Sequence, residues 1–419
     1  MIQRHLLLLL AVRSKKGMFM RARLLSLVLL LGVGAVLPAH LAAQRIKLPY
    51  KTPELETRMH ADSNDPAAHY NLALGYWNDK RYDDAEQSIR TALMLDPRFA
   101  PAHLALAYLP FARRPKLWDE IFQGKVPAEF VASVKESDRE YRHAFLIDPL
   151  VDIRIIGAVT RSKPDFLTVQ DYLGEAYALF FQGFTDCQEG RYEDCHGRFV
   201  ALIREIQGDK FPDRVPNSVL WYKGLAAAHV QQYDVAARHF NQLIDRNIKF
   251  EEELEKKGEL SRVPLATNEF RYALATIKAS SGEVGEAVRL YQQVLEEDPG
   301  LYMAHVRLAN VYDGARDYAN AEKERLFAVN TNPDDPSLLL DLGITLGKAG
   351  KMASAETRLQ EAIKGNPRDS RAYFWLGIAQ TDLGKKEEAK AAFTQFIALS
   401  PSRYAPQIAS AKDRLAKLQ

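Results

Sequence analysis

Proline recurs with a fixed step of 34 residues in the C-terminal third of this chain, and two other residue types keep the same step. The three registers are Pro299, Pro333, Pro367 and Pro401; Ala287, Ala321, Ala355 and Ala389; and Leu274, Leu308, Leu342 and Leu376. Three registers that share one period indicate an array of short units stacked on one another. Each unit then covers the apolar face of its neighbour, so the array grows in one direction.

The residues inside one period predict a pair of helices. A large apolar residue is followed by a small one at Leu342-Gly343, and a second small residue follows at Ala355. Small residues at these positions let two helices approach closely. Gly350 lies between them, where glycine supplies the left-handed backbone that ends a helix. Pro367 then closes the unit because proline cannot continue a helix.

The order and spacing of these residues resemble the tetratricopeptide repeat (TPR) family, and an N-terminal segment resembles it too. The matching N-terminal residues are Leu72-Ala73, Tyr76, Tyr82, Ala85, Ala92 and Asp96-Pro97. The resemblance implies an all-α fold, a right-handed superhelical solenoid of antiparallel helix pairs. It also implies a scaffold that binds a partner protein or peptide, without identifying that partner.

The repeat pattern divides the chain into six predicted segments. We expect a signal peptide at 1–43, an N-terminal capping helix at 44–65, TPR-like units at 66–250 with an insertion near 111–133, a linker or insertion at 251–267, four regular units at 268–403 and a C-terminal capping helix at 404–419. Residues 151–172 match the repeat poorly. A long linker and a distorted helix are both compatible with them.

Residues 1–43 have the pattern of a secretory signal. Arg21 and Arg23 precede an uncharged apolar stretch from Leu24 to Leu37, and Ala43 offers a cleavage site. The stretch is short for a helix that spans a bilayer. We therefore expect an exported protein, periplasmic or extracellular, with a bacterial envelope as the expected setting. An uncleaved N-terminal anchor is the alternative, and it is the only membrane contact that the sequence suggests.

Charge argues against a nucleic-acid partner. The formal net charge is +2, but residues 1–43 hold six basic side chains and no acidic one. The remaining chain has 50 basic and 54 acidic residues, a net charge of −4. A nucleic-acid partner therefore has no support from the net charge, and we expect none.

Cysteine usage is restricted to one pair, Cys187 and Cys195. Export would place them in an oxidising compartment, and their predicted positions on two antiparallel helices allow a disulfide. The alternative is two small buried residues, since Cys195 stands where a TPR has alanine. No second cysteine precedes His196 at the spacing of a haem attachment motif, and no paired histidine stands at ligand spacing. We expect no cofactor and no metal.

The resemblance to TPR proteins also implies which residues would face a partner. The first helix of each unit lines the concave groove in that family. The corresponding residues here are Tyr70, Leu74, Trp77, Asn78, Val306, Asn310, Asp313, Leu340, Ile344, Lys348, Phe374, Ile378 and Thr381. The alternative for each is packing between neighbouring helices. Asp341 stands where a clamp for a C-terminal carboxylate would need asparagine, which argues against that type of partner.

Catalytic motifs are absent from the sequence. It contains no His-Glu-x-x-His, no Gly-x-Ser-x-Gly and no phosphate-binding loop. His69, His103 and His305 fall at one repeat position, which predicts a packing role. We therefore expect a non-enzyme. Alternatives are chemistry in the irregular middle, at 111–175 or 250–268, and a glycan-binding or accessory subunit of a polysaccharide or enzyme complex. The oligomeric state does not follow from the sequence.

Overall fold

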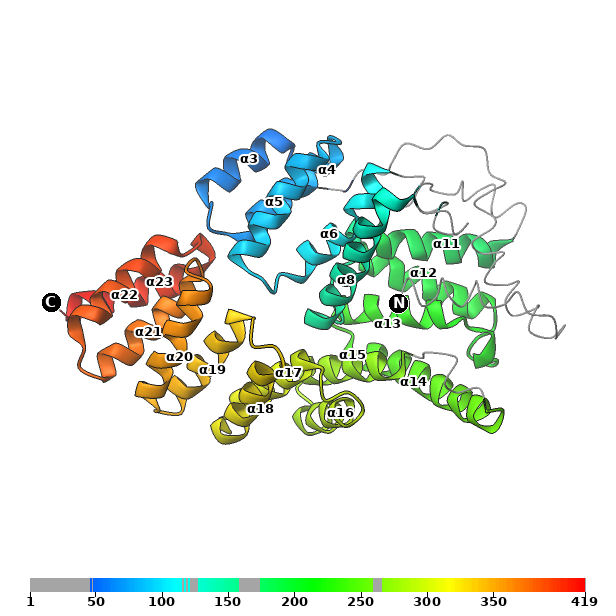
Figure 1. The fold of residues 1–419 in the computed structure, drawn as a ribbon. Coiled ribbons are helices and arrows are strands. Elements are labelled where there is room, and N and C mark those ends of the chain that lie inside the picture. Colours follow the sequence, from blue (N-terminus) through cyan, green and yellow to red (C-terminus); the bar gives the residue numbers. More distant parts are fainter. Residues whose placement is uncertain are drawn as a thin grey trace. The chain divides into compact units, whose positions relative to one another are not determined.

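The structure is a computed structural model that describes residues 46, 48–114, 117, 120, 127–157, 174–258 and 266–418. Regular structure in these ranges is entirely helical (Figure 1). The predicted signal peptide lies outside the described residues. Within the described part of the chain, no helix combines the length and apolarity needed to cross a membrane.

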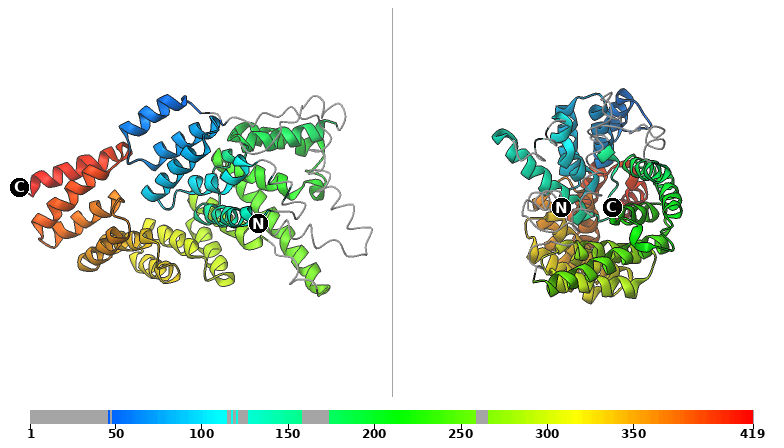
Figure 2. Two further views of the ribbon diagram at one scale, coloured as in Figure 1. Left: turned by 45° about the horizontal axis from the view of Figure 1, so that its top comes forward. Right: turned by 90° about the vertical axis from the view of Figure 1, so that its right-hand side faces the viewer.

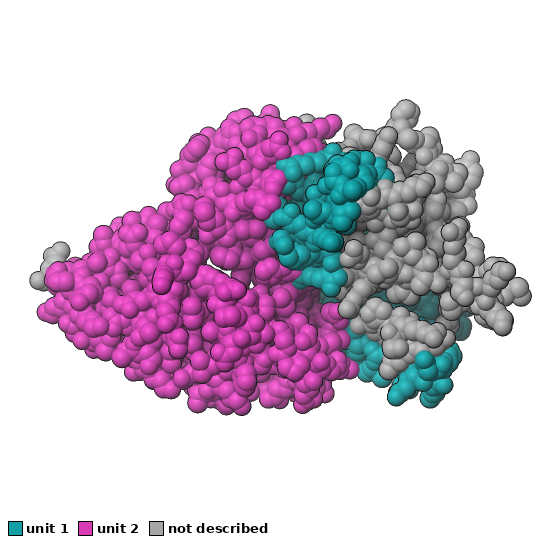
Figure 3. All heavy atoms as spheres, viewed as in Figure 1, with its two compact units in different colours: residues 1–47, 104–142, 152–267 teal, residues 48–103, 143–151, 268–419 magenta. Residues whose placement is uncertain are grey.

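Two compact units make up the chain, coloured separately in Figure 3. Unit 1 comprises residues 1–47, 104–142 and 152–267, and unit 2 comprises residues 48–103, 143–151 and 268–419. Helices α6 (Ala100–Arg113) and α8 (Val131–Ile147) are each continuous across a boundary of this division. Unit 2 therefore contains the N-terminal repeat as well as the regular C-terminal repeats.

The regular repeats of unit 2 confirm the predicted all-α solenoid of antiparallel helix pairs. The helices are α15 (Thr267–Ser280), α16 (Val284–Glu297), α17 (Tyr302–Gly314), α18 (Tyr318–Thr331), α19 (Pro336–Lys348), α20 (Met352–Gly365), α21 (Ser370–Asp382) and α22 (Lys386–Leu399). From α16 onward each helix packs on the next one in the chain. Figures 1 and 2 both show α19 to α22 as successive stacked helices.

Small residues permit the close helix crossings that the sequence predicts. A Cβ added at Gly343 on α19 would lie 2.7 Å from Cγ of Leu359 on α20. A Cβ at Gly377 on α21 would lie 2.8 Å from the ring of Phe393 on α22. Any side chain at these positions would force the two helices apart. Gly350, in the turn after α19, has φ +77° and adopts the predicted left-handed conformation.

Aspartate side chains begin several of these helices. Asp335 accepts a hydrogen bond from the backbone N–H of Ser337 at the start of α19, and Asp369 accepts one from Arg371 at the start of α21. Asp65 does the same for Ala67 at the start of α4 (Pro66–Asn78). Each bond satisfies one of the N–H groups that a helix leaves unpaired at its beginning. The acidic residues before helices are thus explained by capping.

One further helix packs against each outermost regular repeat of unit 2. Helix α3 (Thr52–Ala61) packs on α4, and Thr52 donates a 2.6 Å hydrogen bond to Asp79. Helix α23 (Ala405–Lys417) packs on α22, where Ala411 and Leu418 join a core cluster with Phe393. These helices cover apolar faces that the outermost repeats would otherwise expose.

The N-terminal repeat, α4 and α5 (Tyr82–Leu95), also contacts the C-terminal repeats inside unit 2. Asp62 accepts hydrogen bonds from the backbone N–H (3.0 Å) and the hydroxyl (2.6 Å) of Ser402. Arg403 forms an ion pair with Asp65 at 2.9 Å, and Arg98 forms one with Asp341 at 2.8 Å. The period predicts stacking between neighbours along the chain, but not these contacts between distant repeats.

Unit 1 holds the less regular repeats, in the helix pairs α11 (Glu175–Gln188) with α12 (Tyr192–Glu205) and α13 (Asn217–His229) with α14 (Tyr233–Lys256). The second predicted insertion begins as an extension of α14, which is 24 residues long. The first predicted insertion, near 111–133, begins inside α6 and ends inside α8. In the poorly matched stretch after Val151 a four-residue helix, α9 (Arg154–Gly157), is described, and residues 158–173 lie outside the described ranges.

Candidate partner-binding site

The apolar residues predicted to face a partner on α17, α19 and α21 contribute mainly to packing. Val306 and Leu340 are buried. Ile344 packs against a core cluster of α19 to α22, and Phe374 and Ile378 pack against the cluster of α22 and α23. Packing between helices, the alternative that the sequence left open, describes these five side chains in this conformation.

Two polar residues predicted to face a partner on α17, Asn310 and Asp313, are connected through Arg325, a buried arginine on α18. Arg325 donates hydrogen bonds to Asn310 and to the backbone carbonyl of Val306. Its guanidinium lies 3.4 Å from Asp313 and 3.3 Å from Asp341. Burial would penalise a lone guanidinium heavily, so these acceptors are needed to hold it. We name Asn310, Asp313, Arg325 and Asp341 the Arg325 cluster.

Two further side chains extend the Arg325 cluster along α19. The hydroxyl of Thr345 donates a 3.0 Å hydrogen bond to Asp313, and the ammonium of Lys348 lies 3.7 Å from the same carboxylate. The side chain of Lys348 is about one-third exposed, at 36%. Lys348 is therefore a predicted groove residue that remains accessible beside the cluster.

The Arg325 cluster receives a second guanidinium, from Arg98 in the connection between α5 and α6. One Arg98 nitrogen donates to Asp341 at 2.8 Å, and the other donates to the carbonyl of Ser337 at 2.7 Å. Burial acts to raise the pKa of Asp341, but Arg98 and Arg325 outweigh it and hold that pKa below its usual value. Asp341 is therefore a buried carboxylate that stays ionised between two arginines.

The predicted aromatic anchors of the first repeat are buried against their own unit. Tyr70, Leu74 and Trp77 on α4 are all buried, and Asn78 is half-buried. Tyr70 meets Phe99 edge-on with ring centroids 5.5 Å apart, and Trp77 meets Tyr82 edge-on at 6.0 Å. In this conformation they hold the N-terminal repeat together and are not open to a partner. Thr381, on α21, is half-buried and donates to the carbonyl of Gly377.

Cys187 and Cys195 are joined by a disulfide, with their Cα atoms 5.1 Å apart. It links α11 to α12 across the short turn between them. Both residues are fully buried. The two cysteines are therefore both disulfide-bonded and buried, so the two alternatives from the sequence do not exclude each other.

The repeat-position histidines have two different roles. Nε2 of His69 lies 2.9 Å from the carbonyl of Ser63, and Nε2 of His103 lies 2.9 Å from that of Pro97, in each case six residues earlier. These two bonds tie the first turn of a helix to the connection before it, in line with the predicted packing role. His305 differs, because its Nδ1 lies 2.6 Å from Glu324 on α18.

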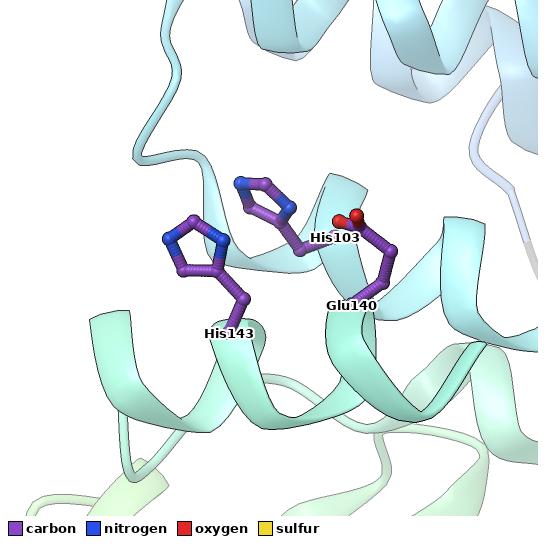
Figure 4. Close-up of side chains that lie close together, drawn as sticks. All are labelled: His103, Glu140 and His143. Atoms are coloured by element: carbon purple, nitrogen blue, oxygen red, sulfur yellow. The ribbon is translucent and has the colours of Figure 1, made fainter. Parts of the chain in front are cut away.

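A histidine outside the repeat position was missed by the sequence reasoning. His143, near the end of α8, contacts His103 with ring centroids 4.4 Å apart and ring planes tilted by 31° (Figure 4). The two are 40 residues apart in the chain, so no spacing motif connects them. The sequence feature that could have drawn attention to His143 was Glu140, three residues earlier. That spacing places two side chains on one face of a helix.

Comparison with known families tests the repeat prediction directly. Two family models described as tetratricopeptide repeat match the chain, one at residues 272–331 and 340–404 and the other at residues 66–99. The chain contains tetratricopeptide repeats. The matched TPR segments are those in which the proline, alanine and leucine registers are clearest, and the TPR fold generally mediates protein–protein interaction. A TPR scaffold is typically non-catalytic.

Solved structures similar to this TPR chain are weakly related in sequence. The C-terminal part of a TPR repeat-containing protein from Cytophaga hutchinsonii has 13% identity and a TM-score of 0.43, over 58% of this chain and 87% of its own. A structure named MamA AMB-1 has 17% identity and a TM-score of 0.35, over 45% and 96%. MamA from Desulfovibrio magneticus RS-1 has 22% identity and a TM-score of 0.31, over 39% and 94%. The comparison with curated proteins found no match.

Proposed function

We propose that this chain is an exported TPR scaffold that binds a segment of a partner protein along α17, α19 and α21. The observation that carries the proposal is the Arg325 cluster. Through Arg325 it joins two predicted groove residues on α17, Asn310 and Asp313, to Asp341 on the next first helix, α19. Polar groups held in place before binding lose little conformational freedom when a partner arrives, which favours specific recognition.

The chemistry of the Arg325 cluster supports a partner that is itself a polypeptide. Asp341 and the Ser337 carbonyl already accept both nitrogens of an arginine side chain, that of Arg98. Planar two-point recognition of a guanidinium is a common mode of protein recognition. Lys348, which lies 3.7 Å from Asp313, supplies a more accessible polar contact beside the cluster.

Export is part of the proposal and rests on the sequence of residues 1–43, which lie outside the described residues. It is tested by mass spectrometry of the protein purified from the cell envelope. A mature N-terminus at Gln44 supports cleavage and export. An intact N-terminus in the cytoplasmic fraction would contradict both.

Site-specific photocrosslinking tests the binding surface. A photoreactive amino acid replaces Lys348 on the first helix α19, and a matched variant carries it at Gln360, an exposed position on the second helix α20 of the same repeat. Irradiation of intact cells should give a discrete crosslinked protein from position 348 and not from position 360. Equal crosslinking at both positions, or none at either, would contradict the assignment of the partner to the first helices.

Binding of a glycan, or service as an accessory subunit of a polysaccharide or enzyme complex, was the alternative from sequence. A glycan site would need aromatic rings lying open on the binding surface. Among the predicted groove residues, Tyr70 and Trp77 are buried and Phe374 is packed against the cluster of α22 and α23. The described residues thus favour a protein partner over a glycan.

A further inference from the structure

A buried lysine in unit 1 occupies a position where the regular repeats have leucine. Lys223 on α13 precedes Gly224, a small residue that packs closely on the next helix. A Cβ added at Gly224 would lie 2.9 Å from the ring of Phe240 on α14, much as one at Gly377 would meet a ring on α22 at 2.8 Å. The residue before Gly377 is Leu376, and this register has leucine in each regular repeat. Lys223 therefore lies in the buried row of its repeat, with 9% of the residue exposed.

Lys223 has no carboxylate partner in the part of the chain that the structure describes. Its side chain forms neither an ion pair nor a hydrogen bond with any described residue. Burial lowers the pKa of Lys223, the charge of Asp209 acts to raise it, and that of Arg238 acts to lower it. Asp209 and Arg238 are both exposed. An ammonium that is buried without a counter-charge is costly, whereas leucine would carry no such cost at this position.

Two imidazoles lie near Lys223, one on each neighbouring helix. His196 is on α12 and His239 is on α14, and α13 packs against both helices. A Cβ added at Gly224, next to Lys223, would lie 3.5 Å from Cβ of His239. Burial, followed by the positive charge of Lys223, lowers the pKa of both imidazoles, to about 4 for His239. The ammonium therefore lies among two imidazoles that are neutral at pH 7.

The two imidazoles differ in their hydrogen bonds. Nδ1 of His239 lies 3.1 Å from Oε1 of Gln242, an acceptor, so this nitrogen carries a hydrogen. Nε2 of His196 is buried and has no hydrogen-bond partner among the described residues. Buried polar atoms in proteins are nearly always paired, so an unpaired one requires an explanation, such as a bound water or ion. A water molecule would satisfy His196 but would not offset the charge of Lys223, whereas an anion would do both.

We propose that Lys223, His196 and His239 bind a phosphate group between α12, α13 and α14. A phosphate group supplies the negative charge that the buried ammonium lacks and oxygens that accept hydrogen bonds from imidazole nitrogens. Its three terminal oxygens match the three basic side chains, and its charge favours the protonated form of both imidazoles. Inorganic phosphate and phosphate monoesters share this chemistry. The site lies within unit 1, so it does not depend on the proposed partner-binding surface of unit 2.

Calorimetric titration of the purified protein with inorganic phosphate at constant ionic strength tests the site. We expect one phosphate ion per chain and a higher melting temperature in its presence. Lys223→Leu should lower the affinity by about 10- to 100-fold, as expected for the loss of a hydrogen bond to a charged group, and His196→Leu by about tenfold. Without phosphate, Lys223→Leu should melt at a higher temperature than the unaltered protein, because it restores the leucine of the register. Its loss of binding would then not be due to unfolding.

Two further variants serve as controls. Lys278→Leu removes a lysine whose side chain is only 17% exposed but which pairs with Glu283 at 2.7 Å, and it should leave the phosphate affinity unchanged. Asp209→Asn should raise the affinity about two- to threefold, because it removes a negative charge that acts on Lys223. A folded Lys223→Leu protein that binds phosphate as tightly as the unaltered protein would overturn the proposal. So would an unaltered protein that binds phosphate no more tightly than Lys223→Leu does.

The same titration with glycerol 3-phosphate distinguishes the two sources of a phosphate group. Tighter binding of the ester than of inorganic phosphate would assign the site to a phosphate monoester, and the reverse order would assign it to free phosphate. Acetate, which has a single charge and two oxygens, should bind more weakly than either. Acetate that binds as tightly as both would overturn the assignment to a phosphate group.

Discussion

Arg98 and Asp341 are 243 positions apart in the chain, and their side chains form a 2.8 Å ion pair inside unit 2. Both are largely buried, with 13% and 17% of their side chains exposed. The pair connects the N-terminal repeat to α19, so it joins segments that a one-dimensional array would keep apart. Its loss should therefore affect the stability of the whole unit.

Arg98→Met should lower the free energy of unfolding by about 2 to 3 kcal/mol, because it leaves Asp341 with one arginine instead of two. Urea unfolding measures the change. A double-mutant cycle with Asp341→Asn should show a coupling energy between the two sites of about 1 kcal/mol or more. Arg58→Met is the control, since Arg58 and its partner Glu54 are each about half exposed and such pairs contribute little. Equal effects of the two arginine variants would contradict the buried contact.

Gly343→Ala should destabilise the protein although alanine is the better helix former. The new Cβ would lie 2.7 Å from Cγ and 2.9 Å from Cδ2 of Leu359, which should cost about 1 to 3 kcal/mol. Gly347→Ala on the same helix is the matched control, because its nearest neighbours lie at 3.9 Å. That variant should be neutral or more stable by up to about 1 kcal/mol. Thermal melting of both variants distinguishes a close crossing from a general intolerance of substitution in α19.

Reduction of the Cys187–Cys195 disulfide should lower the stability of unit 1. The bond closes a loop of eight residues, and loop-closure entropy for that length corresponds to about 2.5 kcal/mol. Melting curves with and without a reductant measure the change, and Cys187→Ala/Cys195→Ala should melt at the same temperature in both conditions. Alkylation of both cysteines in unfolded, non-reduced protein from the cell envelope would show that the disulfide does not form there.

The stability of unit 1 should fall below neutral pH because of His239 on α14. Burial, followed by the positive charge of Lys223, lowers the pKa of His239 to about 4, although a hydrogen bond with Gln242 acts in the opposite direction. An unfolded histidine has a pKa of about 6.5. Between these two values the unfolded chain takes up a proton that the folded chain does not, so stability decreases as pH falls.

Urea unfolding at pH 7.5 and pH 5 tests this prediction. Between pH 7.5 and pH 5, His239 should reduce the free energy of unfolding of the unaltered protein by about 1 to 2 kcal/mol. His239→Gln should lack this contribution, so its free energy of unfolding should fall less. His60→Gln, at an exposed position, is the control and should keep the full pH dependence. If His239→Gln also keeps it, another group is responsible.

The repeat itself was predictable from sequence because it depends on local rules. The position of Gly343 opposite Leu359, the turn at Gly350 and the aspartate at the start of α19 all follow from residues within one period. The matches of two TPR family models to 66–99, 272–331 and 340–404 agree with these registers.

The candidate sites were only partly predictable. Asn310 and Asp313 were named from their place in the repeat, but Arg325 and Arg98, which hold them and Asp341 in one group, were not. Arg325 lies on a second helix and Arg98 lies in a distant connection. Likewise, nothing in a 40-residue separation indicates that the ring of His143 contacts that of His103.

The sequence by itself determined the helix pairs, their order and their close crossings, because these depend on contacts between residues less than one period apart. The tertiary structure alone decided that Arg98 reaches Asp341, that Trp77 is buried and not open to a partner, and that His103 meets His143. The physical reason is the same for each. A helical period fixes which face a side chain occupies, whereas the partner on that face depends on which distant segment packs there.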